Sequence, residues 1–215
     1  NMFRDCAALT ECDLTNFQTA NATSLMGMFQ GCSSLKSLAF NKQITTNVSN
    51  VSRMFQGCTS LETVDISSLT VARVTYMNAM FKDCYALTSI TFEEKFDTAK
   101  VLNMSQMFEN CYALRTLDLT RMETVSVTTM NSMFQDCSSL VELNISEWTL
   151  KSGTNATTVE NMFANDIKLV KIYVGQGWHG GTTLTASTTM FVNCLSIEGA
   201  DNTHYQSTDL SLIHI

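Results

Sequence analysis

The sequence predicts an α/β repeat fold: a solenoid with a parallel β-sheet on one face and short helices on the other. A Met-Phe dipeptide recurs along the whole chain at steps of 26 to 29 residues, which is the signature of stacked coils. Within each repeat the apolar spacing changes from three and four residues to two. The composition is 45% hydrophobic, enough for a long core that neighbouring coils share. The eight dipeptides begin at Met2, Met28, Met54, Met80, Met107, Met133, Met162 and Met190.

The segment around each Met-Phe dipeptide is predicted to be a short helix. Spacings of three and four residues place apolar side chains on one face of a helix. Equivalent spacings start at Val74 and Val127, and the polar neighbours of these apolar residues take the outer side. In one repeat the apolar residues are Val101, Met104, Met107, Phe108, Cys111 and Leu114.

The segment after each cysteine is predicted to be a short, half-buried strand. In residues 114–119 the last two leucines are spaced by two, so Thr116 and Asp118 should point away from the core. Equivalent strands are expected at residues 61–66, 87–92 and 140–145, paired in parallel with one another. The chain has no proline, which is compatible with a strand in every coil. Asp, Ser, Thr and Asn cluster after the strands, as in turns and helix N-caps.

Seven of the eight cysteines form one column, three residues after each repeat's phenylalanine. Equivalent residues of stacked strands are about 4.8 Å apart with parallel side chains, whereas a disulfide needs converging Cβ atoms nearer about 3.8 Å. We therefore expect free buried thiols, with some disulfide pairing or a metal site as the alternatives. Cys12 instead replaces a core strand residue. Asp166 holds the cysteine position in its repeat, where a carboxylate must find backbone donors or reach water.

The consensus Met-Phe-x-x-Cys-x-x-Leu-x-x-Leu-Asp-Leu resembles the BspA-like surface repeats, a leucine-rich-repeat class of host-associated bacteria and some protozoa. The best matches are residues 47–61 and 107–119, and the resemblance covers residues 1 to about 197. It implies a leucine-rich-repeat-like solenoid, a cell-surface or secreted location, and adhesion to host or bacterial surface proteins. It brings no catalytic residues with it.

The repeats define a solenoid over residues 1–198, with about eight coils, followed by a C-terminal cap or tail at residues 199–215. Extra residues fall within 93–95, near 150–153 and within the glycine-rich segment 175–181. Insertions in solenoids map to loops and often mark the binding side. The last insertion contains Trp178, which either forms part of a binding surface or folds back over the terminal coil. The chain opens inside a repeat, so we expect a fragment of a longer protein.

The outward strand positions and the C-terminal edge of the sheet form the candidate ligand-binding surface. Its side chains are short, polar and mildly acidic, which favours a basic macromolecular partner and salt-sensitive association. The alternative is that this surface is an ordinary solvated sheet face that binds no ligand. Tyr173 and Trp178 are the only aromatic residues expected outside the core. The candidate residues are Asp65, Asp118, Glu142, Asn144, Tyr173 and Trp178.

Several classes of function are disfavoured by composition. A net charge of −7 argues against a nucleic-acid partner, which needs clustered lysine and arginine. No stretch approaches the roughly 20 apolar residues of a membrane helix, so we expect no direct membrane insertion by this segment. The three histidines lie near the C-terminus, and no catalytic or metal-binding spacing accompanies them, so no enzyme activity, metal or cofactor is predicted.

Two functions remain after these exclusions. The first is a cell-surface binding or adhesion module that recognises an extracellular or host surface protein, or a glycan, through a solenoid surface. The second is a structural spacer that displays another domain away from the cell. The family resemblance favours binding, while the sequence leaves the ligand, source organism, anchor and oligomeric state open.

Overall fold

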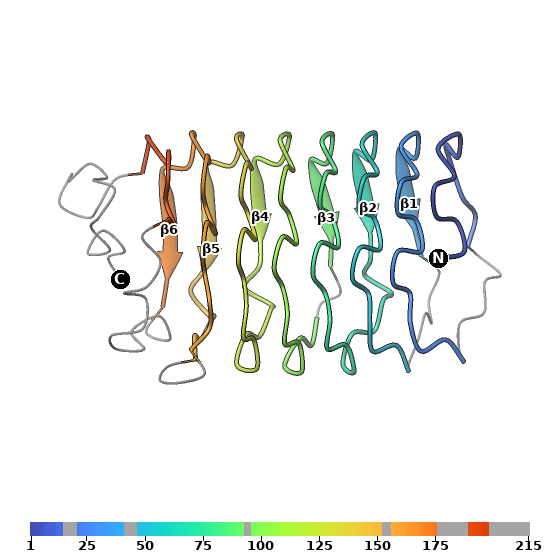
Figure 1. Cartoon of the computed structure of the whole chain (residues 1–215), viewed down its shortest axis with the longest axis horizontal. Helices are drawn as coiled ribbons and strands as arrows, with labels where there is room; N and C mark the ends of the chain where they lie inside the picture. The colour runs from blue at the N-terminus through green and yellow to red at the C-terminus, as the bar shows by residue number, and fades with distance from the viewer. Residues whose placement is uncertain (15–20, 41–46, 93–95, 152–155, 176–188, 198–215) are drawn as a thin grey trace.

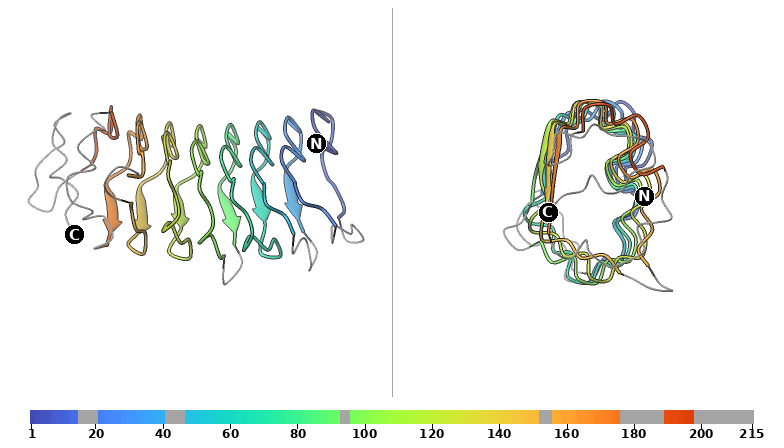
Figure 2. Two further views of the ribbon diagram at one scale, coloured as in Figure 1. Left: turned by 60° about the horizontal axis from the view of Figure 1, so that its bottom comes forward. Right: turned by 90° about the vertical axis from the view of Figure 1, so that its left-hand side faces the viewer.

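The computed structural model is a solenoid whose coils follow one another along a single axis (Figure 1). It describes residues 1–14, 21–40, 47–92, 96–151, 156–175 and 189–197. Viewed along the axis, successive coils superimpose on one closed outline that surrounds the core (Figure 2). The predicted cap at residues 199–215 lies outside the described residues.

Six coils each contribute one strand to the front face, as the alternating pattern predicted. The strand expected around Cys12 in the first coil is absent, since residues 9–14 have no regular secondary structure. The strands are β1 (Ser37–Ala39), β2 (Thr63–Asp65), β3 (Ser89–Thr91), β4 (Thr116–Asp118), β5 (Glu142–Ile145) and β6 (Lys171–Val174). Consecutive strands within each sheet pair in parallel, and equivalent residues are in register, for example Leu38 with Val64 and Leu117 with Leu143. The expected parallel pairing of consecutive repeats is confirmed within each sheet and fails between β3 and β4.

The front face is divided into two sheets of three strands, β1-β2-β3 and β4-β5-β6. Although β3 and β4 follow one another in the chain, they do not pair. The step between them is 27 residues, from Ser89 to Thr116, whereas the steps before it are 26. The predicted one-residue insertion at 93–95 lies between these two strands and outside the described residues.

A second ladder runs along the back of the solenoid without this interruption. Single parallel bridges link six consecutive coils, including Tyr76 with Asn103 across the point where the front sheets separate. Asn50 and Asn103 each accept a hydrogen bond at Oδ1 from the backbone N–H two residues later, at 2.9 Å. These bonds turn the chain toward the next segment. The bridged residues are Ser24, Asn50, Tyr76, Asn103, Thr129 and Thr158.

The expected short helices are absent: the described residues contain strands, bridges and turns only. The Met-Phe segment is instead a corner that bonds to its neighbour. The N–H groups of Arg53, Phe55 and Gly57 donate to carbonyls of the next coil at 2.9–3.0 Å. In a helix these donors would stay within the segment. The helix prediction is wrong because two left-handed residues per corner, Arg53 (φ 57°) and Gly57 (φ 74°), fold the chain back and produce the same inward spacing.

A column of phenylalanine rings, one from each Met-Phe dipeptide, runs through the core. Adjacent rings from Phe3 to Phe191 are stacked, with centroids 5.2–5.7 Å apart and nearly parallel planes. Offset stacking of this kind adds about 0.5–1.5 kcal/mol per pair beyond the burial of apolar area. Trp148 is also buried and donates from Nε1 to the carbonyl of Leu119 at 3.1 Å.

All eight cysteines are free thiols, and the six column cysteines from Cys32 onward are buried. Each of these six thiols donates to the phenylalanine carbonyl of the preceding coil, for example Cys58 to Phe29 at 3.1 Å and Cys137 to Phe108 at 3.1 Å. The thiol therefore fills a small apolar site and satisfies a backbone acceptor. Cys6 departs from the prediction because it is exposed, and Cys12 is half-buried.

Candidate functional site

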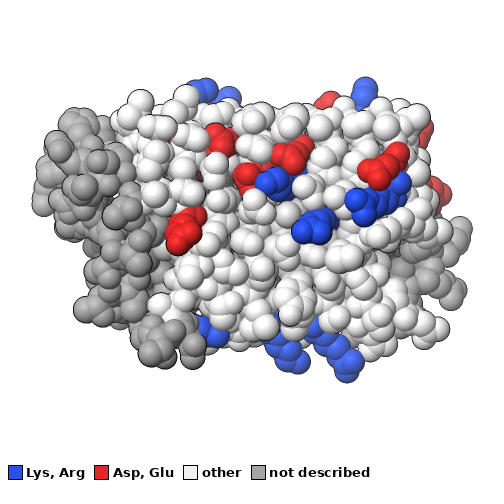
Figure 3. All heavy atoms as spheres, viewed as in Figure 1, with Lys and Arg blue, Asp and Glu red and all other residues white. Residues whose placement is uncertain are grey.

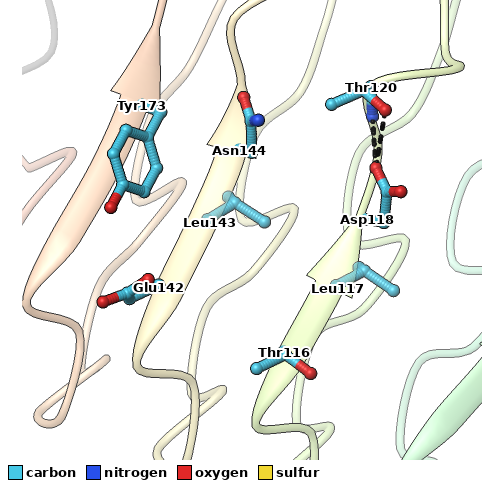
Figure 4. A pocket seen from close by; sticks show the side chains of 8 residues that line it. All are labelled: Thr116, Leu117, Asp118, Thr120, Glu142, Leu143, Asn144 and Tyr173. Carbon is cyan, nitrogen blue, oxygen red and sulfur yellow. Dashed lines mark hydrogen bonds between the residues drawn. The ribbon is translucent and has the colours of Figure 1, made fainter.

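A shallow depression lies on the front face over β4, β5 and β6 (Figure 4). Its volume is about 420 Å³. We call it the front depression. Its lining combines acidic, amide, hydroxyl, aromatic and aliphatic side chains. These residues are Thr116, Leu117, Asp118, Thr120, Glu142, Leu143, Asn144 and Tyr173.

Strand register brings the polar side chains of the front depression together. Asp118, Asn144 and Tyr173 are partners across β4, β5 and β6 and form one row. A second row, two residues earlier, contains Thr116, Glu142 and Lys171, although Lys171 does not line the depression. Neighbouring strands are about 4.8 Å apart, so each row spans roughly 10 Å. Such a row is wide enough to contact a side chain or a short extended segment of a partner.

Asp118 is held in place by local hydrogen bonds. Its Oδ1 accepts from the N–H of Thr120 at 3.1 Å and from the hydroxyl of Thr120 at 2.7 Å (Figure 4). These hydrogen bonds, assisted by nearby Arg121, lower the pKa of Asp118 below its ordinary value. The group is therefore a carboxylate at neutral pH and keeps its negative charge under mildly acidic conditions.

The same local bond recurs at the last residue of β2 and at the residue before the last of β5. Asp65 accepts from the N–H of Ser67 at 2.9 Å, and Asn144 accepts from the N–H of Ser146 at 3.1 Å. This is an Asx turn, in which a short side chain bonds the backbone two residues on and ends the strand. Asp65, Asp118 and Asn144 therefore each have a structural role in their own coils, whatever else they bind.

Tyr173 supplies the aromatic surface of the front depression. Its side chain projects from β6 and 47% of its area is exposed. Figure 4 shows its ring and the Glu142 carboxyl group on adjacent strands, facing the same side. A tyrosine face beside carboxylates is suited to a cationic group, which gains from both the ring quadrupole and the negative charge.

Four of the six predicted surface residues come together here: Asp118, Glu142, Asn144 and Tyr173. Asp65 lies on β2, in the other front sheet, and does not line the depression. Trp178 lies outside the described residues. The grouping follows from the parallel register of consecutive coils, and Asp65 is separate because β2 lies two coils before β4.

The expectation that exposed aromatics occur only near the C-terminal end was wrong. Tyr76, Tyr85 and Tyr112 are each more than 40% exposed. Tyr85 and Tyr112 follow the column cysteines of consecutive coils and stack at 5.1 Å. The sequence could have indicated that these tyrosines are exposed, because most other repeats have a small residue or a short hydroxyl side chain at this position.

Charge is sparse and mixed on the face shown in Figure 3, where acidic and basic side chains are interspersed among neutral ones. Over the described part of the chain, no group of three or more His, Cys, Asp or Glu side chains is placed to hold a metal ion. Within those same ranges no helix could span a bilayer. The three histidines, His179, His204 and His214, lie outside the described residues.

The buried thiols are poorly suited to nucleophilic chemistry. Burial raises the pKa of Cys32 to about 11 and the pKa of Cys58 to about 12. For Cys194, burial and then nearby Asp166 raise the pKa to about 12. A thiol with a raised pKa has little reactive thiolate at neutral pH. These cysteines are therefore packing groups in the coils where they are described.

A protein-family model described as "Mycoplasma protein of unknown function, DUF285" matches residues 1–92 and, in a second match, residues 88–204. Together the two matches cover nearly the whole sequence. No curated protein matches the chain.

Two bacterial proteins of known structure are similar at low identity. A leucine-rich repeat protein from Bacteroides ovatus shares 21% identity over 71% of this chain and 40% of its own, with a TM-score of 0.41. A leucine-rich cell surface protein from Faecalibacterium prausnitzii shares 14% identity over 80% of this chain and 48% of its own, with a TM-score of 0.30. The chain spans less than half the length of either protein. Likeness at this level says nothing about ligand or activity.

Proposed function

This chain belongs to the DUF285 family of Mycoplasma proteins of unknown function, and we propose that it is a binding module that recognises a basic protein segment through the front depression. The observation that carries the proposal is the row Asp118–Asn144–Tyr173, with Glu142 in the neighbouring row, two residues earlier on β5. It combines a fixed carboxylate, an amide, a second carboxylate and an exposed ring. That combination suits a lysine or arginine side chain.

The physical case for a basic partner rests on three contributions. Asp118 keeps its charge because its pKa is lowered by the Thr120 hydrogen bonds. Its hydrogen bonds also fix it before binding, so little side-chain entropy is lost when a partner arrives. Tyr173 adds a rigid aromatic contact of the kind enriched at binding hot spots. We also propose a cell-surface location for the module, as the repeat resemblance implies.

The proposal is tested by fluorescence anisotropy with a labelled peptide of alternating lysine and serine. The same peptide with acetylated lysines, a glutamate–serine peptide and a neutral oligosaccharide serve as comparison probes. We expect binding of the lysine peptide alone, weakened by added salt because exposed charges are screened. Binding of the oligosaccharide instead would move the proposal to a glycan ligand, and equal binding of the acetylated peptide would refute the charge argument.

Matched variants locate the site. Asp118→Asn should weaken binding several-fold, while Asp65→Asn, which makes the same local turn in the other front sheet, should leave it unchanged. Likewise Tyr173→Ala should weaken binding and Tyr112→Ala, also an exposed tyrosine, should not. Equal losses for each pair would place binding elsewhere or spread it over the whole solenoid.

A spacer function has its own supporting observation. Asp65, Asp118 and Asn144 all form the same Asx turn at or next to the last residue of their strands, so their recurrence is accounted for without any ligand. A spacer predicts that none of the probes binds and that Asp118→Asn lowers only stability. The anisotropy measurements therefore distinguish the two functions.

A further inference from the structure

Asp166 interrupts the column of thiols inside the solenoid. It occupies the cysteine position between Cys137 and Cys194, and none of its area is exposed. The sequence led to the expectation that it would find backbone donors or reach water. It does neither: among the described residues, both carboxyl oxygens lack a hydrogen-bond partner. A buried polar group without a partner costs about 1–3 kcal/mol, and more when it is charged.

The neighbouring coils show what this position requires. Cys137 donates its thiol proton to the carbonyl of Phe108 at 3.1 Å, and Cys194 donates to Phe163 at 2.7 Å. By the same repeat geometry, the carbonyl facing residue 166 is that of Phe134. A protonated carboxyl group has a proton to offer this acceptor, as a thiol does. An ionised carboxylate has no proton to donate, so its oxygen and the carbonyl oxygen would be two hydrogen-bond acceptors facing each other.

The surroundings of Asp166 oppose its ionisation. Burial, with a smaller contribution from Asp136, raises the pKa of this carboxyl well above its ordinary value. Hydrogen bonding by the N–H of Cys137 acts to lower the pKa of Asp166, but this N–H group already donates to the carbonyl of Phe134 at 3.0 Å. Cys137 and Cys194 are the titratable groups above and below it, and both carry raised pKa values themselves. None of these neighbours is a cation that would compensate a carboxylate.

The coil that contains Asp166 also carries β6. The carbonyl of Asp166 accepts from the N–H of Leu169 at 3.0 Å, and β6 begins two residues later at Lys171. Tyr173, the aromatic wall of the front depression, is on this strand. Loosening at Asp166 therefore acts on the strand that completes the depression.

We propose that Asp166 is a proton-dependent latch, which holds the β6 coil in place when protonated and loosens it, together with Tyr173, when ionised. The latch concerns regulation of the binding surface and, in that respect, rests on the proposed function. Its direction follows from linkage. A carboxyl group that holds its proton more tightly in the folded state contributes stability that is complete below the ordinary value of about 3.9. That contribution is lost as the pH rises toward the raised folded value. The contribution of Asp166 therefore holds the β6 coil most firmly in acidic surroundings.

Hydrogen–deuterium exchange of the unliganded protein tests the latch without any ligand. Between about pH 3.9 and the folded pKa of Asp166, protection of residues 166–174 should fall by up to about tenfold per pH unit, after correction for the intrinsic exchange rate. In Asp166→Asn, which cannot ionise, this fall should be absent. Asp166→Cys should restore the column and give higher protection with no such pH dependence. Residues 114–119, on β4 and its approach, serve as the internal control.

The outcomes separate the latch from the proposed function. Equal pH profiles for the wild type and Asp166→Asn would overturn the latch, even if the lysine peptide binds. A pH-dependent loss of protection confined to the wild-type β6 coil would support it, even if no peptide binds. If both hold, peptide affinity in the wild type should fall with rising pH relative to that in Asp166→Cys, which shares the carboxylates of the front depression.

Discussion

Replacing Phe108 with leucine isolates the contribution of ring stacking to the stability of the solenoid. Phe108 is fully buried and stacks on Phe81 at 5.7 Å and on Phe134 at 5.5 Å. Leucine retains most of the apolar burial but removes both ring pairs. At about 0.5–1.5 kcal/mol per pair, the free energy of unfolding should fall by about 1–3 kcal/mol. Phe108→Ala also leaves a cavity and should cost about 3–5 kcal/mol.

The end of the column provides the matched control. Phe3 is only half-buried and has one stacked neighbour in the structure, Phe29, at 5.2 Å. Phe3→Leu should therefore cost about half as much as Phe108→Leu, about 0.5–1.5 kcal/mol. Urea denaturation followed by circular dichroism measures both variants, provided that the slope against denaturant is unchanged. Equal costs at the two positions would refute the reasoning that each coil is stabilised by its nearest neighbours.

Three further predictions concern the strands, the thiols and the corners. Leu117→Ala should cost about 2–5 kcal/mol in urea melts because the side chain is buried, whereas its outward neighbour Thr116→Ala should stay within about 0.5 kcal/mol. Thiol titration in denaturant without reductant should count eight cysteines, and a count of two or fewer would establish disulfides. Gly57→Val should cost about 1–3 kcal/mol because φ is +74°, while Gly57→Asn should cost less. Similar thermal shifts for these last two variants would contradict left-handed strain.

The strands were predictable from the sequence because their side chains alternate cleanly. In β4 the pattern exposed–buried–exposed over Thr116, Leu117 and Asp118 matches the alternation within the repeat. The fixed period then places equivalent residues of consecutive coils in register. These two features of the sequence suffice to predict that Asp118, Asn144 and Tyr173 lie in one row.

The corners were misread because apolar spacing alone does not distinguish a helix from a chain folded by left-handed residues. The missed signal is the residue before the column position, which has positive φ in every coil and is always glycine, aspartate or asparagine. These residue types adopt that conformation most readily. The second left-handed position, before the methionine in six of the repeats, includes Arg53 and Ala79 and carries no such signal. The positions before the column residue are Asp5, Gly31, Gly57, Asp83, Asn110, Asp136, Asn165 and Asn193.

The interruption between β3 and β4 was not predictable because strand pairing depends on the geometry between coils. The 27-residue step from Ser89 to Thr116 revealed an insertion but not that β3 and β4 would fail to pair. The exposure of Tyr85 and Tyr112 was missed because both residues lie in segments that the apolar spacing predicts to be helical. Both errors concern the path that the chain takes between strands, which the apolar spacing does not define.

The division of the front face has a mechanical consequence. Between β3 and β4, as the described residues define them, the front lacks strand pairing, while the back bridge from Tyr76 to Asn103 and the Phe81–Phe108 stack continue across the gap. A rod with one side cut and the other intact bends most easily at the cut, with the intact side as its pivot. We therefore expect the solenoid to flex as two stiff halves, opening on the front between β3 and β4, so that the angle between Asp65 and the front depression varies while each half keeps its shape.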